Sequence, residues 1–329
     1  MEPLFADTAA IDLAVSLLHQ GRLVAFPTET VYGLGADASN PDAVRRIFQA
    51  KGRPADHPLI VHIAHQDQLY EWAASVPDTA LQLAAQFWPG PLAMILPKQP
   101  QVSALVTGGQ NTVGLRMPNH PVALQLLAAF GGGVAAPSAN RFCKISPTLA
   151  AHVAEELGTA VDLILDGGAC QVGVESTIID LSGKLPVLLR PGHITREAIA
   201  EALNSQVLLS PSVGKDSIRA PGMMAVHYAP TTAAVLCPTD QLAALAAQLS
   251  STGQTSALLS YSLAAEAYGY DVGIKLPAQP EDYAHKLYAS LRTLDDWQVA
   301  LIVVELPPQT ETWRAVNDRL GKATKRASV

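Results

Sequence analysis

The chain has 329 residues, of which 49% are hydrophobic and 16% are charged, and this length predicts two domains. The composition excludes an intrinsically disordered chain, because it supplies ample apolar surface for packed cores. The formal net charge of -7 disfavours non-specific nucleic-acid binding, which requires a basic face.

Neither the cysteines nor the N-terminus indicates an exported protein. Cys143, Cys170 and Cys237 are odd in number, lie far apart and show no metal-ligand spacing, so we expect reduced thiols. The first residues are acidic and lack the basic and apolar regions of a signal peptide. No uncharged apolar run reaches the roughly 20 residues of a membrane span. We therefore expect a soluble, cytoplasmic protein.

Helices and strands are mixed irregularly over the first 205 residues. Helical spacing of apolar residues predicts helices at 8–20, 41–50, 67–74, 78–87, 121–130, 148–157 and from 195 onward. Short apolar runs predict strands at 23–26, 59–64, 92–96, 112–116, 134–136, 163–166, 176–181 and 186–190. Because the elements do not alternate strictly, we expect an α/β or α+β sheet with both parallel and antiparallel pairs.

A linker and a second, smaller domain follow. Residues 206–230 show little periodicity and contain several prolines and glycines, which is typical of a linker. Beyond it the pattern predicts strands at 233–236, 256–259 and 299–305, and helices at 241–249, 281–294 and 312–325. This β-α-β-α order favours a largely parallel sheet. The predicted division is a first domain at 1–206, a linker at 207–231 and a C-terminal domain at 232–329.

Polar residues gather where the strands of the first domain end. The stretch Phe26-Pro-Thr-Glu-Thr-Val-Tyr-Gly-Leu-Gly35 begins as a buried strand and turns polar within three residues. Arg53, Arg116 and Arg190 follow a helix or end a strand, and guanidinium groups bind phosphate and carboxylate bidentately. In an acidic protein this pattern suggests a site for a small anion. The alternative is three solvated arginines that pair with surface carboxylates.

Three further groups are ambiguous by themselves. Pro137-Ser-Ala-Asn140 supplies a hydroxyl and an amide at a strand exit, but it also fits a plain turn. Glu175-Ser-Thr177 supplies hydroxyls, but it also fits the start of a strand. His62 alternates with apolar neighbours, as a structural histidine on a strand does.

Rival nucleotide-binding and hydrolase motifs fit poorly. Gly33-x-Gly35-x-x-Ala38 with Asp56 downstream resembles a dinucleotide fingerprint, but the helix cap, Asn40-Pro41, comes after the glycines instead of among them. The sequence contains no Gly-x-x-x-x-Gly-Lys-Ser/Thr loop and no Gly-x-Ser-x-Gly elbow. If the protein binds ATP, it must therefore do so through a different motif.

Taken together and in order, the motifs resemble one family. Pro27-Thr-Glu-Thr-Val-Tyr-Gly-Leu-Gly35, Lys51-Gly-Arg-Pro54, Pro58-Leu-Ile-Val-His62, Arg116-Met-Pro118, Pro137-Ser-Ala-Asn140, Gly173-Val-Glu-Ser-Thr177 and Leu189-Arg-Pro-Gly192 are similar to the YrdC-type domain of threonylcarbamoyl-AMP synthases. Ala220-Pro-Gly-Met223 and His227-Tyr-Ala-Pro230 resemble the linker of the long, two-domain members. The resemblance is strong over residues 8–230 and weak beyond, where Asn317-Asp-Arg-Leu320 is also family-like.

The resemblance implies a fold and a reaction. The fold is an open twisted mixed α/β sheet around a deep basic cavity, with a small Rossmann-like C-terminal domain whose linker reaches over the site. The reaction condenses L-threonine, bicarbonate or CO2, and ATP, with Mg2+, to threonylcarbamoyl-AMP and pyrophosphate. A tRNA threonylcarbamoyl transferase complex would then receive the product, and no stable nucleic-acid binding is expected.

The same resemblance implies roles for individual residues. The residues carried over to the threonine site are Thr30, His62, Arg116, Ser138 and Ser176. The residues carried over to the ATP site are Lys51, Arg53, His57, Thr112, Asn140, Ser146, Thr148 and Arg190. Lys51 and Arg53, on the phosphates, are the expected catalytic residues, Arg116 would pair with the amino acid's carboxylate, and no protein-bound metal is expected.

The sequence departs from the family pattern at a few positions. His57 stands where other members often have asparagine, and Cys143 stands near a common glycine. In the linker, the basic and aromatic residues of other members are replaced by Met224, Ala225 and Val226. The sequence therefore does not predict whether this linker closes over the site. Two other functions stay open as well: an O-carbamoyltransferase that handles a carbamoyl-adenylate, and a non-enzymatic RNA-binding module.

Overall fold

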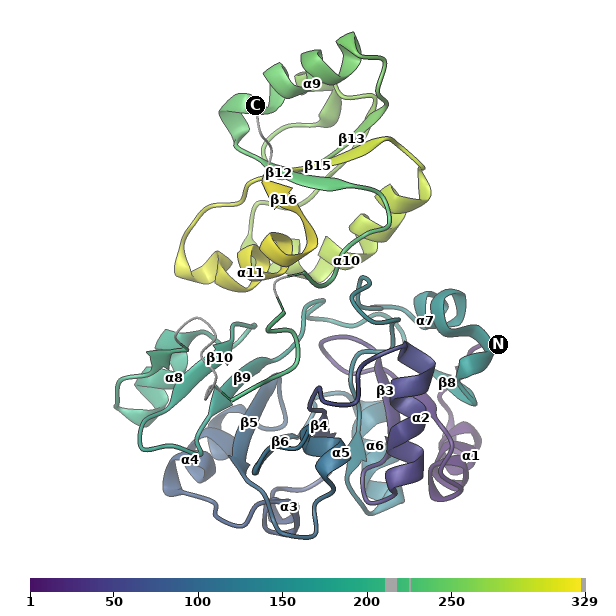
Figure 1. The fold of residues 1–329 in the computed structure, drawn as a ribbon, viewed down its shortest axis with the longest axis vertical. Helices are drawn as coiled ribbons and strands as arrows, with labels where there is room; N and C mark the ends of the chain where they lie inside the picture. The colour runs from purple at the N-terminus through teal and green to yellow at the C-terminus, as the bar shows by residue number, and fades with distance from the viewer. Residues whose placement is uncertain (211–217, 225, 327–329) are drawn as a thin grey trace. The chain divides into compact units, whose positions relative to one another are not determined.

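The computed structural model describes residues 1–210, 218–224 and 226–326, which form two compact units (Figure 1). The first unit comprises Met1–Phe142, Pro147–Gln171 and Glu175–Met223. The second comprises the rest: Cys143–Ser146, Val172–Val174 and the chain from Met224 onward. Ala225 lies outside the described residues, as do positions 211–217 of the predicted linker, so the linker's boundaries stay a prediction.

The first unit is built on one large mixed sheet. Its strands in the described residues are β1 (Leu4–Phe5), β2 (Val24–Phe26), β3 (Gly33–Asp37), β4 (Ile60–His62), β5 (Leu92–Pro97), β6 (Thr112–Arg116), β7 (Val134–Ala135), β8 (Leu163–Asp166), β9 (Thr177–Asp180), β10 (Val187–Arg190) and β11 (Leu208–Leu209). They are ordered β1-β8-β2-β3-β7-β4-β6-β5-β9-β10-β11. Parallel and antiparallel pairs alternate irregularly, since β4 runs parallel to β6 but antiparallel to β7. The predicted mixed sheet is confirmed.

Helices cover the two faces of this sheet unequally. The helices are α1 (Thr8–His19), α2 (Pro41–Lys51), α3 (Leu69–Trp72), α4 (Asp78–Phe87), α5 (Ala104–Thr107), α6 (Pro121–Phe130), α7 (Ala150–Leu157) and α8 (Arg196–Leu203). One face packs against α2, α3, α4, α5, α7 and α8 in the main apolar core. On the other face, α1 and α6 pack over β2, β7 and β8.

The second face changes character beyond β7. On β4, β5 and β9, its apolar residues form a small cluster with the linker residues Ala220 and Met223. Strand side chains alternate between faces, so His62 lies on the face of Ile60 and opposite the main-core residue Val61. His62 therefore lies on the face of the sheet opposite the main core, beside Phe26 at the border of the part that α1 and α6 cover.

The second unit contains a wholly parallel sheet. Its strands are β12 (Ala234–Cys237), β13 (Ser256–Ser260), β14 (Val272–Lys275), β15 (Leu301–Glu305) and β16 (Lys325–Arg326), in the order β14-β13-β15-β12-β16. Its helices are α9 (Leu242–Ser251), α10 (Pro280–Asp296) and α11 (Arg314–Ala323). Among the residues of this unit that the structure describes, every strand pair is parallel, which confirms the predicted Rossmann-like organisation.

Two short segments from early in the sequence belong to this second unit. The amide of Ala229 donates to the carbonyl of Cys143 at 3.0 Å, and Arg292 of α10 donates to the carbonyl of Ile145. At Gly173, which has a φ of +80°, an added Cβ would lie 2.5 Å from the carbonyl oxygen of Ala284 in α10. Only glycine permits that approach.

The structure corrects several predicted elements. β3 and β14 were not predicted, because the short runs Gly33–Asp37 and Val272–Lys275 each contain glycine, which weakens a strand signal. The helix expected to start at Thr148 is capped by Leu149 instead. In the part of the chain that the structure describes, no helix has both the length and the apolar character to cross a membrane.

Candidate active site

Three of the predicted site residues lie on one row across the sheet. His62 at the end of β4 pairs in register with Arg116 at the end of β6. Three strands beyond β6, Arg190 at the end of β10 pairs with Ile178 of β9. β5 connects the two halves of the row, because its Ala93 pairs with Ile178.

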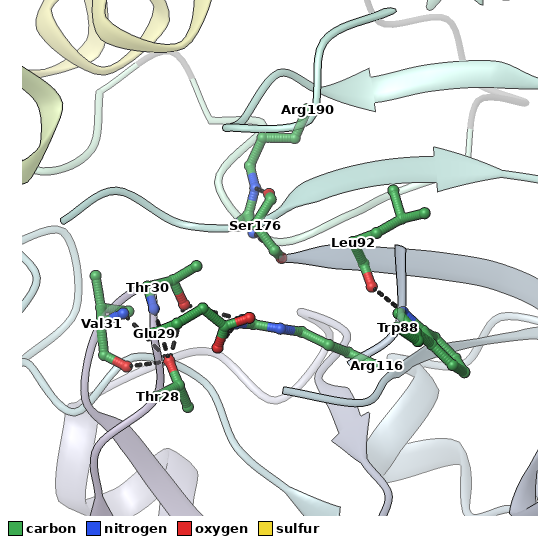
Figure 2. A network of polar contacts seen from close by, with 9 residues as sticks. All are labelled: Thr28, Glu29, Thr30, Val31, Trp88, Leu92, Arg116, Ser176 and Arg190. Carbon is green, nitrogen blue, oxygen red and sulfur yellow. Dashed lines mark hydrogen bonds and ion pairs between the residues drawn. The ribbon is translucent and has the colours of Figure 1, made fainter. Parts of the chain in front are cut away.

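The turn after β2 supplies the partners of Arg116. The hydroxyl of Thr28 donates to the carbonyl of Val31 at 2.7 Å and lies 2.9 Å from the hydroxyl of Thr30, so the turn is closed by its own side chains. Nη1 of Arg116 donates to Oγ1 of Thr30 at 3.0 Å. Nη2 of Arg116 lies 2.6 Å from Oε2 of Glu29 in a buried ion pair (Figure 2).

That ion pair leaves hydrogen-bonding capacity unused. Although Nη2 and Oε2 are close, their geometry gives no aligned hydrogen bond, and Oε1 of Glu29 and Nε of Arg116 also have no hydrogen bond among the described residues. Glu29 and Arg116 are 3% and 4% exposed. Buried charged groups normally satisfy every donor and acceptor, so this pair is prepared for a further partner.

Two uncharged histidines adjoin this pair. Burial, and secondarily the charge of Arg116, lower the pKa of His62 to about 3. Burial likewise lowers the pKa of His120, an effect that the carboxylate of Glu29 partly offsets. Nδ1 of each ring has no hydrogen bond within the described ranges. Both imidazoles are therefore neutral at physiological pH and can donate or accept one hydrogen bond.

Arg190 holds Ser176 in place. Its Nε and Nη2 donate to the carbonyl of Ser176 at 3.0 and 2.9 Å, and Nη2 also reaches the hydroxyl at 3.1 Å (Figure 2). Nη1 donates to the carbonyl of the linker residue Pro221 at 3.2 Å. Arg190 thus connects a strand start and the linker, and its predicted contact with ATP stays a prediction.

Lys51 and the turn after β7 form a second polar group. The ammonium of Lys51, the last residue of α2, donates to the carbonyl oxygens of Ser138 and Asn140. Ser138 also bridges to Gly33 at the start of β3, next to the turn that contacts Arg116. The charge of Lys51 is therefore fixed at the strand exit where the sequence predicts the nucleotide.

The remaining predicted nucleotide residues are more dispersed. Arg53 follows α2 and donates to the carbonyl of Pro58 at 2.9 Å. The ring of His57 stacks edge-on against Phe142 with centroids 5.3 Å apart, and burial and the charge of Arg53 lower its pKa. Thr112 starts β6, at the opposite end of the strand from Arg116.

Two predicted residues lie close together in sequence but in different units. Thr148 belongs to the first unit, where its amide donates to Nδ1 of His152 at 3.3 Å and its carbonyl accepts from Cys170 at 3.0 Å. Ser146 belongs to the second unit. The binding roles of both residues stay predictions.

The sequence analysis missed two residues of the cluster. Glu29 was treated as one polar residue of a turn, and His120 was given no role. The available signal for Glu29 was a lone carboxylate among hydroxyls directly after a buried strand. Among the described residues, no group of three or more His, Cys, Asp or Glu side chains could hold a metal ion.

The fold and these contacts define an α/β protein with a buried site that combines a guanidinium, a carboxylate, hydroxyls and neutral imidazoles. Two family descriptions match the chain. One, for Sua5, YciO and YrdC proteins and described as "Telomere recombination", matches residues 16–192. The other, described as "Threonylcarbamoyl-AMP synthase, C-terminal domain", matches residues 194–325.

Characterised relatives agree with these matches. Threonylcarbamoyl-AMP synthase of Pyrococcus abyssi is 42% identical over 95% of this chain and 94% of its own length. The enzyme of Bacillus subtilis is 42% identical over 98% of this chain and 95% of its own length. The chain belongs to the threonylcarbamoyl-AMP synthase family.

Solved structures support the same fold. The crystal structure of P. abyssi Sua5 complexed with L-threonine superposes with a TM-score of 0.90 at 40% identity, over 97% of this chain and 96% of that one. HypF in a phosphate- and nucleotide-bound form superposes with a TM-score of 0.50 at 17% identity, over 55% of this chain and 28% of that one. At that identity the likeness to HypF shows a shared fold alone.

Proposed function

We propose that this protein condenses L-threonine, bicarbonate or CO2, and ATP to threonylcarbamoyl-AMP and pyrophosphate, for transfer to tRNA by a separate enzyme complex. The observation that carries the proposal is the buried cluster around Arg116, in a chain that belongs to this family. Nε of this guanidinium has no hydrogen bond among the described residues and can donate to a substrate carboxylate.

The amino acid is bound through the row of site residues. Arg116 binds its carboxylate, and Thr30, which accepts from Nη1, fixes the orientation of the guanidinium. His62, uncharged and in register beside Arg116, is available to the threonine hydroxyl. Ser176 contributes its hydroxyl from a position that Arg190 fixes, and Ser138 contributes from the turn that Lys51 fixes.

ATP lies towards the turn after β7. Lys51 is fixed at that turn and Arg53 follows it by two residues, and both positive charges would stabilise the charge that develops on the phosphates. Within the first unit, the remaining proposed nucleotide contacts are Thr112, Asn140, His57 and Thr148. Because the described residues offer no carboxylate cluster, Mg2+ would be held by the phosphates and water, where it neutralises phosphate charge.

The chemistry requires positioning more than covalent catalysis. The α-ammonium of threonine first gives a proton to water, and the neutral amine then forms a bond to the carbon of CO2 while the electron pair of one C=O bond moves to its oxygen. The second proton on the nitrogen passes to water to leave the carbamate, and bicarbonate enters the same step after it loses hydroxide to give CO2. A carbamate oxygen then attacks the α-phosphorus of ATP, and the bond between the α-phosphorus and the bridging oxygen breaks to release pyrophosphate. Holding three small reactants in line can account for several kcal/mol of the barrier.

The decisive measurement is pyrophosphate release. With ATP, bicarbonate and Mg2+ present, release should require threonine, and chelation of Mg2+ should abolish it. Threonine-independent release would contradict the proposal. Tight, salt-dependent RNA binding without pyrophosphate release would instead favour the RNA-binding alternative, and carbamoyl phosphate supporting ATP turnover in place of threonine would favour the O-carbamoyltransferase.

A further inference from the structure

Besides the two atoms that face each other in the ion pair, four buried polar atoms around Arg116 lack hydrogen bonds within the described part of the chain. They are Oε1 of Glu29, Nε of Arg116, Nδ1 of His62 and Nδ1 of His120, and none of these residues is more than 5% exposed. Proteins rarely leave one such atom without a partner, and four in one cluster indicate that a ligand supplies the partners.

Contacts show that the four atoms belong to one cluster. Glu29 lies 2.6 Å from Arg116, and Arg116 is in register with His62. The ring of His120 lies beside Gly167 together with Pro27, which comes two residues before Glu29. Figure 2 shows the carboxylate of Glu29 facing the guanidinium of Arg116.

Each atom specifies the group that would satisfy it. Nε of Arg116 would be satisfied by an acceptor such as a carboxylate oxygen, and Oε1 of Glu29 by a donor such as an ammonium group. The neutral imidazoles need an uncharged donor or acceptor, such as a hydroxyl. A hydroxylated α-amino acid carries all three groups on adjacent carbons.

The balance of charge adds a second argument. The charges of Glu29 and Arg116 sum to zero, and so do the charges of the ammonium and carboxylate groups of a zwitterion. A ligand with the carboxylate but without the ammonium would place an uncompensated negative charge beside the buried Glu29, which is strongly unfavourable.

We propose that Glu29 receives the α-ammonium of the amino acid substrate and thereby selects a zwitterion over a plain hydroxy acid. This inference rests on the proposed function, because it takes threonine to be the occupant of the cluster. Glu29 is then a specificity-determining residue in direct contact with substrate, and Arg116 is free to turn its unused Nε towards the substrate carboxylate.

The test compares two ligands by calorimetry. One is L-threonine, and the other is (2S,3R)-2,3-dihydroxybutyrate, in which a hydroxyl replaces the amine. The wild-type protein should bind threonine at least about 10-fold more tightly. Glu29→Gln should weaken threonine binding by about 10- to 100-fold, the range expected for a hydrogen bond between charged groups, and leave the analogue equally or more tightly bound.

A matched control separates this role from a general effect of lost charge. Asp180 is also a buried carboxylate on the same sheet, but it accepts from Ser182 and not from Arg116. Asp180→Asn should leave the ratio of the two affinities unchanged. If Glu29 serves only as a counter-ion of Arg116, Glu29→Gln would change both affinities by the same factor, and that result would overturn the inference.

Wild-type measurements keep the inference testable if Glu29→Gln does not fold. Equal wild-type affinities for the two ligands would overturn it directly. If the wild-type protein also releases pyrophosphate in a threonine-dependent manner, only this inference falls. If it neither binds threonine nor shows that release, the proposed function falls as well.

Discussion

The guanidinium of Arg190 donates to the backbone carbonyl of Ser176 from two nitrogens, Nε at 3.0 Å and Nη2 at 2.9 Å. The resemblance assigns Arg190 to ATP and Ser176 to threonine. In the structure, however, Arg190 fixes the position of Ser176, so it can influence the threonine site without touching ATP.

Replacement of Arg190 by lysine tests this positioning role. Lysine keeps the charge but cannot donate from two coplanar nitrogens, so we expect KM for threonine to rise about 10-fold while KM for ATP changes less. Steady-state pyrophosphate release at varied threonine and at varied ATP concentrations measures the two KM values separately. Arg196→Lys, at an arginine paired with Glu197 on the surface, serves as the control. A rise confined to KM for ATP would instead support direct nucleotide contact.

Removal of Arg116 should affect both binding and stability. Arg116→Ala removes the expected partner of the substrate carboxylate and leaves Glu29 buried without its counter-ion. Loss of one partner of a buried ion pair typically destabilises the folded protein by about 3–5 kcal/mol. We expect KM for threonine to rise at least about 100-fold and the free energy of unfolding to fall. Denaturant titration of the double variant Glu29→Gln/Arg116→Ala should show part of that stability restored, without restored threonine binding. Unchanged threonine kinetics in Arg116→Ala would refute its assignment.

His62 should make stability depend on pH. Its pKa is about 3 in the folded protein, below the ordinary value of 6.5, so between these values the unfolded chain binds a proton that the folded chain does not. The free energy of unfolding should therefore fall as pH falls below 6.5, by about 1.4 kcal/mol per pH unit from this residue. Urea unfolding of wild type and His62→Asn at pH 7 and pH 5 isolates the effect. Parallel losses in both proteins would show that His62 is already charged when folded.

Gly192 should be intolerant of any side chain. An added Cβ would lie 2.3 Å from the amide nitrogen of Thr177 and 2.7 Å from the carbonyl carbon of Ser176, so the backbone would have to shift. We expect Gly192→Ala to raise KM for threonine and to lower the melting temperature by several degrees. Gly183→Ala, with no atom within 4 Å of the added Cβ, is the matched control and should change neither. Equal behaviour of the two variants would contradict the packing argument.

Most of the local elements of the first sheet were predicted from the sequence. Asn40 caps α2 as expected, because its side chain accepts from the first helical amides and Pro41 has no amide to satisfy. Arg116 was expected at a strand end, and the structure adds that it lies in register with His62, because parallel strands bring their carboxyl ends to one edge of the sheet. These features depend on a few neighbouring residues.

What sequence reasoning missed depends on distant contacts. The role of Glu29 is visible only when β6 brings Arg116 to the turn after β2. β3 is stabilised by close packing: a Cβ at Gly35 would lie 2.7 Å from the ring of Phe26, and this neighbour cannot be identified from glycine content. The hydrogen bonds from Lys51 to two carbonyl oxygens of the turn after β7 likewise could not be predicted without the fold.

The second unit includes Cys143–Ser146 and Val172–Val174, which come long before its main segment in the sequence. A fragment cloned from Met224 onward would therefore lack three of its own acceptors and packing surfaces: the carbonyl that binds Ala229, the carbonyl that binds Arg292, and the glycine that fits against α10. If the C-terminal half were expressed alone, the second unit would thus be incomplete. The roles of the two units are better compared by point substitutions in the intact polypeptide.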